Sequence, residues 1–296
     1  MQWKNWLFKS KKFAIGDTPL IRRKRLIELF SFPKLLVKDE SRNPFGTFKD
    51  RRNELIIKKA MEARIDKLAL ITSGNSGYSL ARLAEGTGIK VVCIVDRKID
   101  PHIKEHLKKY AEKVIEVDLS QKIFRTEDII DLARGTSVHE EVWDVTNDYH
   151  EAFHSIVGEI EGEDPDYLIC PLGSGEAYVG LYEGLKKYRL KTKLIGVGVH
   201  ELRDNELTLS GSPSIADKLY TPYTPYRRRI EEVILEEGHF YRHVSDEQII
   251  NTYEKIKRII SCEPSSAAAF AALPELDIDK NGKVIVINSG KGVWGI

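Results

Sequence analysis

The sequence has 296 residues, of which 42% are hydrophobic and 31% are charged, and its formal net charge is +1. This length can bury a large apolar core and, at about 100–200 residues per domain, favours two domains over one. The balanced charge gives no field that would attract nucleic acid, and no apolar run approaches the roughly 20 residues of a membrane span. The start, Met1 to Lys12, lacks the apolar core of a signal peptide. We therefore expect a cytoplasmic protein that binds neither nucleic acid nor membranes.

Cysteines and histidines give no metal-binding pattern. Cys93, Cys170 and Cys262 are odd in number and lack Cys-x-x-Cys spacing, and two of them lie in apolar runs typical of strands. They are predicted to be reduced, buried side chains without a disulfide or a metal site. His150 and His154 are four residues apart and would share a helical face, but no third ligand is nearby, so we expect no metal there.

Short β-branched runs alternate with amphipathic stretches along the chain. Apolar strands separated by helices are typical of buried parallel sheets, so the predicted fold class is α/β, with two open, mainly parallel three-layer lobes. The segment from His200 to Tyr241 interrupts this alternation and is predicted to be an irregular, functional connection. Predicted strands cover 68–72, 91–95, 114–117, 167–172, 194–199 and 283–288, and predicted helices cover 50–64, 76–85, 101–110, 123–133, 151–161, 176–188, 245–260 and 265–273.

One lysine, Lys49, lies between a turn containing proline and glycine and the helical pattern from Asp50 to Arg64. The positive end of a helix and partial burial both favour the uncharged form of an amine, which can attack a carbonyl group. A surface lysine beside a helix start is the alternative, and for any single lysine of a chain with 46 Lys and Arg it is the more common case. The rest of the chain has to distinguish the two.

Three turns rich in glycine and hydroxyl side chains directly follow predicted strands: Thr72 to Gly77, Gly173 to Ala177 and Asn288 to Gly292. Ligands of open α/β sheets bind at that edge. The amides of Gly173 to Ala177 would hold a phosphate at a helix start, although GSGEAYVG matches neither a P-loop nor a dinucleotide fingerprint. Thr72 to Gly77 offers donors for a carboxylate, with an ordinary helix cap as the alternative. Together with Lys49, these turns indicate pyridoxal phosphate and an amino acid.

The same segments resemble those of fold type II, tryptophan synthase β-like, pyridoxal-phosphate enzymes. Phe45 to Arg51 resembles the segment around their Schiff-base lysine, and Thr72 to Gly77 resembles their asparagine loop. Gly16 to Leu20 and Val37 to Glu40 resemble their opening and the strand before the lysine, so the resemblance covers nearly the whole chain in order. Within the family the chain is most similar to threonine synthases, at Phe48 to Arg51, Ser214 to Asp217 and Glu263 to Ala268.

The resemblance implies pyridoxal 5'-phosphate in the cleft between a smaller domain, residues 41–142, and a larger one, residues 1–40 plus 143–296, in a homodimer. It implies that Lys49 is the catalytic Schiff-base residue, that Asn75 lies beside the ring hydroxyl and that Ser289 faces the pyridine nitrogen. A neutral hydroxyl there favours loss of a leaving group over transamination. The implied cofactor contacts are Phe48, Lys49, Asn75, Gly173, Ser174, Gly175, Glu176, Ala177 and Ser289, and the implied substrate contacts are Thr72, Ser73, Ser76, Tyr149 and His150.

The implied activity is that of a lyase acting on a small O-activated amino acid, with threonine formation from O-phosphohomoserine as the first choice. Two features depart from threonine synthases. Arg52 stands where they usually have glycine, and Asp148 to Ala152 lacks their arginine, a charge that Arg52 could replace. Cysteine synthase-like β-replacement, serine/threonine dehydration and non-catalytic binding of the cofactor or an amino acid therefore stay open.

Overall fold

The computed structural model describes residues 13–136, 139–203, 206–208, 214–220, 225–236 and 238–292. Met1 to Lys12 and parts of the segment from His200 to Tyr241 lie outside the described residues, and so do the predictions made for them. The chain divides into two compact units, one built on Asn43–Tyr149 and the other on Gly16–Arg42 together with His150–Gly292. The domain boundaries expected from the sequence, residues 41–142 and 1–40 plus 143–296, stay a prediction.

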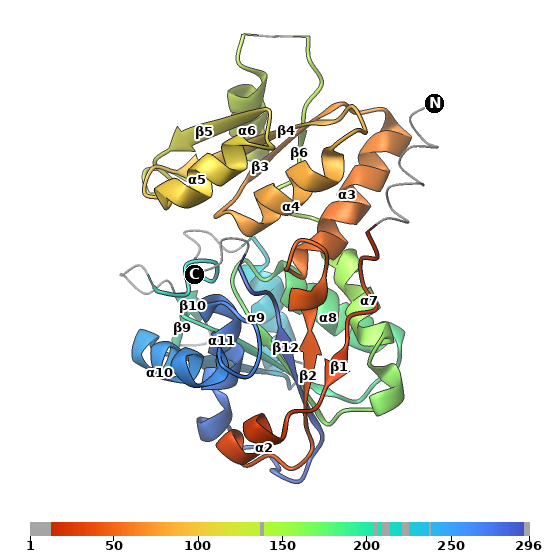
Figure 1. Ribbon diagram of the computed structural model, residues 1–296, viewed down its shortest axis with the longest axis vertical. Coiled ribbons are helices and arrows are strands. Elements are labelled where there is room, and N and C mark those ends of the chain that lie inside the picture. Colours follow the sequence, from red (N-terminus) through yellow and green to blue (C-terminus); the bar gives the residue numbers. More distant parts are fainter. Residues whose placement is uncertain are drawn as a thin grey trace. The chain divides into compact units, whose positions relative to one another are not determined.

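The unit built on Asn43–Tyr149 contains a four-stranded parallel sheet in the order β5-β4-β3-β6 (Figure 1). Leu68 and Leu70 of β3 belong to one buried cluster and Ala69 belongs to another. Both faces of the sheet are therefore covered, and the strands read as continuous apolar runs rather than alternating ones. The strands are β3 (Lys67–Ile71), β4 (Lys90–Asp96), β5 (Lys113–Val117) and β6 (Trp143–Asp144).

Four helices complete the layers of this unit. Ile56 of α3, Leu80 of α4 and Leu107 of α5 pack in the cluster that contains Leu68, whereas Ile129 of α6 packs in the cluster on the other face. Periodic apolar side chains thus fix which face each helix covers. The helices are α3 (Lys49–Ala63), α4 (Asn75–Ala84), α5 (Pro101–Lys108) and α6 (Thr126–Arg134).

The second unit contains a six-stranded sheet in the order β1-β2-β12-β7-β8-β11. Strand β1 is antiparallel to β2, and every other pairing is parallel. The carboxyl ends of five strands therefore lie at one edge of this sheet, where ligands of α/β proteins bind. The strands are β1 (Leu20–Ile21), β2 (Leu35–Asp39), β7 (Tyr167–Pro171), β8 (Lys193–Gly198), β11 (Phe240–His243) and β12 (Val284–Asn288).

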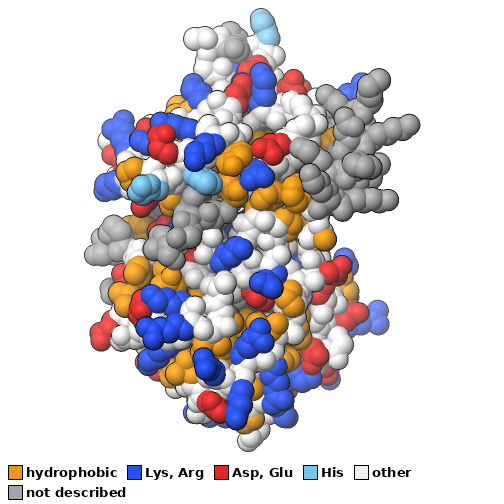
Figure 2. Space-filling model, in the orientation of Figure 1, with side chains coloured by type: hydrophobic (Ala, Val, Ile, Leu, Met, Phe, Trp, Pro, Cys, Tyr) orange, Lys and Arg blue, Asp and Glu red, His pale blue; other side chains and the backbone are white. Residues whose placement is uncertain are grey.

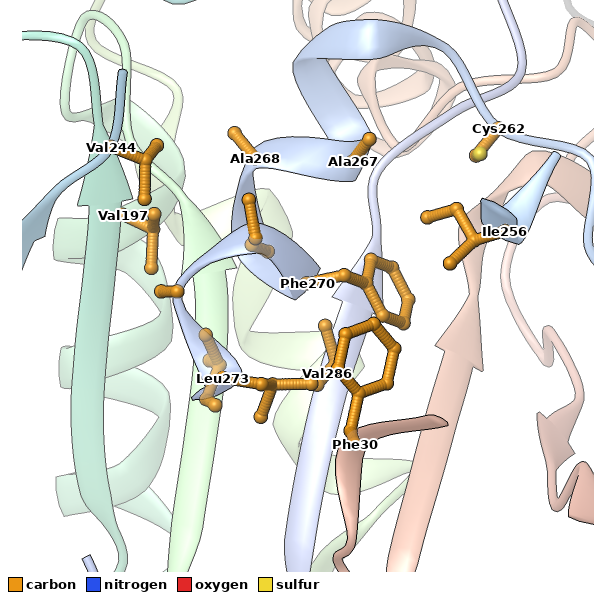
Figure 3. Close-up of a cluster of buried hydrophobic side chains, with 14 of the residues drawn as sticks. Phe30, Val197, Val244, Ile256, Cys262, Ala267, Ala268, Phe270, Leu273 and Val286 are labelled. Atoms are coloured by element: carbon orange, nitrogen blue, oxygen red, sulfur yellow. The ribbon is translucent and has the colours of Figure 1, made fainter. Parts of the chain in front are cut away.

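The core of the second unit lies between its sheet and helices on one face (Figure 3). The rings of Phe30 and Phe270 face one another with centroids 6.2 Å apart, and Val286 lies beside them. On the opposite face, a Cβ added to Gly196 of β8 would lie 2.9 Å from the ring of Tyr178. The unit's helices are α2 (Lys24–Phe30), α7 (His154–Gly158), α8 (Glu176–Lys187), α9 (Arg227–Glu236), α10 (Asp246–Ile256) and α11 (Pro264–Ala271).

Two predicted elements differ in the structure. The expected helix 151–161 is divided into η2 (His150–Phe153), α7 and η3 (Glu161–Glu163), because Gly158 and Gly162 weaken a continuous helix. The described part of 200–241, expected to be irregular, contains α9, the strand β11 and a two-stranded antiparallel ribbon. Strand β11 was missed because it is an edge strand of mixed polarity whose Phe240 is exposed, so it lacks an apolar run. The ribbon consists of β9 (Glu201–Arg203) and β10 (Glu206–Thr208).

Charges on the surface are mixed in sign, as Figure 2 shows for one face. The arginine run of α9 pairs with glutamates of the same helix, Arg227 with Glu231 at 2.9 Å and Arg228 with Glu232 at 3.0 Å. Such i,i+4 pairs are typical of a solvated helix face. None of the helices in the described ranges has the length and apolarity needed to cross a bilayer.

The three cysteines are buried and free, as predicted. Burial raises the pKa of the Cys93 and Cys262 thiols to about 12 and also raises the pKa of Cys170. Because the thiolate is the reactive form, we expect these thiols to react with an aromatic disulfide reagent on the order of a thousandfold more slowly than free cysteine near neutral pH. Absorbance of the released thiol measures this, and all three should react after denaturation. Fast reaction of the folded protein would contradict the burial.

Candidate active site

Lys49 is the first residue of α3, as the sequence predicts, and its side chain is half-buried. The turn before it is tied to the helix, because the Phe45 amide donates a hydrogen bond to the Asp50 carboxylate at 2.7 Å. The Lys49 Nζ lies 5.5 Å from the centroid of the Phe48 ring. The amine therefore sits at the positive end of a helix of 15 residues, next to an apolar ring.

The turn after β3 is closed by Thr72. Its buried Oγ1 accepts hydrogen bonds from the amides of Gly74 and Gly77, at 3.0 and 3.1 Å. Both lone pairs of this oxygen are then used, and the hydroxyl proton is what Thr72 can offer to a ligand. Ser73 is exposed and Ser76 is half-buried beside it. These hydroxyls surround the start of α4, where first-turn amides favour an anion.

Two side chains of α3 contact this turn. Asn53 Nδ2 donates to the Ser76 carbonyl oxygen at 2.9 Å, and Arg52 Nη1 donates to the Ser76 Oγ at 3.3 Å. Neither contact follows from a local sequence pattern. The one signal that could have indicated Asn53 is its spacing of four residues from Lys49, since residues four apart share a helical face.

Tyr149 lies beside the cations of α3. The Arg52 guanidinium carbon is 5.5 Å from the Tyr149 ring centroid, and the Lys59 Nζ is 5.3 Å from it. Arg52 itself is only 1% exposed. The unit built on Asn43–Tyr149 thus brings together seven of the predicted site residues, namely Phe48, Lys49, Thr72, Ser73, Asn75, Ser76 and Tyr149.

The glycine turn Gly173 to Ala177 follows β7 and leads into α8. Gly175 is the N-cap and has φ +91°, a left-handed conformation that favours glycine. A Cβ there would also clash with the Ile230 side chain and lie 3.0 Å from the Tyr226 Cβ, so only glycine fits at this position beside the positive helix end. The Glu176 side chain is 1% exposed, so it is packed into the protein.

Ser289 follows β12, the neighbour of β7 in the sheet, so this serine and the glycine turn lie on adjacent strand ends. Its Oγ is 2.7 Å from the Oγ of Ser266, which donates to the Gly290 carbonyl at 2.8 Å and accepts from the Gly290 amide at 2.9 Å. Either hydroxyl can be the donor in the contact between the two serines. Ser266 was not predicted as a site residue.

His150 belongs to the second unit and contacts its helices. Its Nε2 is 3.2 Å from Glu183 Oε2, and His154 Nε2 is 3.4 Å from the same oxygen, so the two histidines share a face as expected. Tyr149 and His150, predicted as joint substrate contacts, thus belong to different units. The second unit holds the predicted residues His150, Gly173, Ser174, Gly175, Glu176, Ala177 and Ser289. In the ranges that the structure describes, no group of three or more metal-ligating side chains could hold a metal ion.

Comparison with known proteins identifies the family. Residues 11–290 match the family model of pyridoxal-phosphate dependent enzymes, and the chain belongs to this family. A threonine synthase of Methanosarcina acetivorans is 26% identical over 305 residues, which cover 93% of this chain and 74% of that protein.

Solved structures share the fold. Maize serine racemase has a TM-score of 0.78 at 17% identity and covers 98% of this chain and 92% of its own. The O-acetylserine dependent cystathionine β-synthase of Helicobacter pylori has a TM-score of 0.77 at 21% identity and covers 95% of both chains. These similarities confirm the predicted α/β fold of fold type II enzymes, and the family makes pyridoxal 5'-phosphate the cofactor, as expected.

The residues of the second unit fit this cofactor. A phosphate dianion requires several donors, and the amides of the glycine turn and of the start of α8 are donors of this kind. An aromatic nitrogen requires one polar neighbour, and the buried Ser289 hydroxyl lies on the adjacent strand end. In the first unit, Lys49 has a half-buried amine at a helix start, the kind of group that reacts with a carbonyl compound.

Proposed function

We propose that this chain catalyses elimination and replacement on a small O-activated amino acid, with O-phosphohomoserine as substrate and threonine as product. The observation that carries the proposal is the 26% identity to a threonine synthase across 93% of the chain. The reaction breaks the Cγ–O bond, releases inorganic phosphate and adds water at Cβ. Phosphate and threonine therefore form in equal amounts.

When bound, pyridoxal phosphate supplies an electron-withdrawing ring that acidifies the substrate Cα–H. We assign the other tasks to residues of this chain. Lys49 would hold the cofactor through its amine and would carry a proton to and from the substrate. Thr72, Ser73 and Ser76 hold the substrate carboxylate, and Tyr149 contacts the substrate.

The remaining assignments concern the cofactor. The amides of Gly173 to Ala177 would hold its phosphate, Asn75 and Phe48 would contact its ring, and Ser289 would be the polar neighbour of its pyridine nitrogen. A hydroxyl, unlike a carboxylate, does not keep that nitrogen protonated, which favours expulsion of a leaving group over transamination.

A second candidate is β-replacement or dehydration of serine derivatives. It is favoured by the segment Asp148 to Ala152, which has no arginine and whose His150 lies 3.2 Å from the Glu183 carboxylate. An imidazole beside a carboxylate attracts a phosphate ester less than a guanidinium does. Binding of the cofactor or an amino acid without turnover is the remaining alternative.

A side-by-side assay tests the proposal. Purified protein reconstituted with pyridoxal phosphate is given O-phosphohomoserine, O-acetylserine with sulfide, L-serine or L-threonine in separate reactions. We expect equal amounts of threonine and phosphate from the first. Cysteine or a keto acid as the sole product would replace this activity with the second candidate. A loaded protein that turns over none of the four would be a binding protein.

We further propose that the protein is a cytoplasmic homodimer and that its ligand is a small amino acid. Light scattering coupled to gel filtration would measure the mass of the assembly, and cell fractionation would test the compartment.

A further inference from the structure

Arg52 is a charged side chain in the core of the first unit. It lies on α3, three residues after Lys49, and is 1% exposed, although burial of a cation is costly unless hydrogen bonds satisfy it. The contacts of the Arg52 guanidinium therefore show what this buried charge does.

The guanidinium of Arg52 joins three segments of the unit. Nη2 donates to the Val145 carbonyl oxygen, and Nη1 donates to Asn53 Oδ1 at 3.1 Å and to Ser76 Oγ at 3.3 Å. Asn53 in turn holds the Ser76 carbonyl oxygen at 2.9 Å. Both the backbone and the hydroxyl of Ser76 are thus bonded to side chains of α3.

The direction of the Arg52–Ser76 hydrogen bond is fixed by chemistry. A guanidinium can only donate, so Ser76 Oγ accepts and keeps its own O–H for another acceptor. The Asn53 Oδ1 is 3.5 Å from Ser76 Oγ, a long contact for that proton. Accepting from a cation polarises a hydroxyl and strengthens it as a donor to an anion.

We propose that Arg52 is a positioning residue that determines the affinity of this chain for the α-carboxylate of an amino acid by acting through the Ser76 hydroxyl. The inference rests on the proposed function, in which Ser76 holds that carboxylate. Arg52 donates to the Ser76 hydroxyl, and the Ser76 hydroxyl donates to the carboxylate. The charge of Arg52 thus acts on the ligand through one intervening side chain. The ligand class is an α-amino acid, and an amine without a carboxylate gains nothing from Arg52.

Calorimetric titration of the cofactor-loaded protein with L-serine and with serinol, which lacks the carboxylate, tests the inference. We expect R52Q to weaken L-serine binding about tenfold and serinol binding less than twofold, because the Ser76 hydroxyl that donates to the carboxylate loses the cation that polarises it. S76A should weaken L-serine binding similarly, and R52Q/S76A should lose no more than S76A alone. R52K, which keeps the charge, should restore part of the affinity.

Lys59→Gln is the matched control, since Lys59 lies over the same Tyr149 ring on the same helix and is not among the contacts of Ser76. It should bind L-serine as the wild type does. Equal losses for serine and serinol in R52Q, or additive losses in the double variant, would overturn the inference and leave the proposed function intact. Failure of the wild type to bind any amino acid would overturn both. If R52Q does not fold, the R52K and S76A variants test the inference by the same comparison of L-serine binding with serinol binding.

Discussion

Replacing Lys49 by alanine is expected to abolish covalent attachment of the cofactor and to lower turnover by at least about a thousandfold, because no other group takes over a covalent catalyst's amine. Lys49 opens α3, half-buried beside the Phe48 ring. Borohydride reduction followed by mass spectrometry measures attachment. The wild type should carry one phosphopyridoxyl group on the peptide that contains Lys49, and K49A should carry none.

Lys58→Ala is the control for this substitution, because Lys58 is exposed on the same helix. It should be labelled at Lys49 and turn over substrate as the wild type does. Labelling of K49A at another lysine, with turnover retained, would move the catalytic amine away from α3. The absorbance of cofactor that remains bound to K49A shows whether the glycine turn Gly173 to Ala177 still binds the cofactor without the covalent bond.

Gly180→Ala is expected to destabilise the second unit by about 1–3 kcal/mol, although alanine normally favours a helix over glycine by up to about 1 kcal/mol. Gly180 lies in α8 where the helix approaches η2. A Cβ there would clash with the His150 carbonyl oxygen and lie 3.1 Å from the Phe153 Cβ. Because the obstacle is backbone, it cannot rotate away, so packing outweighs helix propensity.

The midpoint of urea unfolding, followed by circular dichroism, measures this loss. Gly162→Ala is the matched control, since a Cβ at Gly162 meets nothing within 4 Å. Its midpoint should stay unchanged or rise slightly. A midpoint of G180A at or above that of the wild type would show that α8 can move away from η2 without cost.

The sheets could be predicted from sequence because their signal is local. Val91 to Val95 is a continuous apolar run, and the structure buries it on both faces of a parallel sheet. The positions of Lys49 at a helix start and of Gly173 to Ala177 after a strand also follow from neighbouring residues. Strand β11 could not be predicted, since its place beside β8 depends on the sheet and not on its own composition.

The supporting contacts of the candidate site were beyond sequence reasoning for a related reason. The carbonyl that Arg52 contacts is 93 positions away in the chain, and the Ser76 hydroxyl is 24 positions away. Ser266 contacts Gly290, which is also 24 positions away in the chain. Periodicity says that such side chains are buried or exposed, but their partners are set only when the segments pack.

The neighbouring strands β2 and β12 have a consequence for protein synthesis. Asp39 ends β2, and the Asn288 side chain that bonds to it lies 249 positions later. At about 5–20 residues per second, the ribosome needs roughly ten to fifty seconds to make the missing neighbour, and until then β2 has an unpaired edge prone to aggregation. The segments of the Asn43–Tyr149 unit emerge within that interval. Strand β2 is therefore an aggregation-prone edge of the nascent chain until β12 has been synthesised.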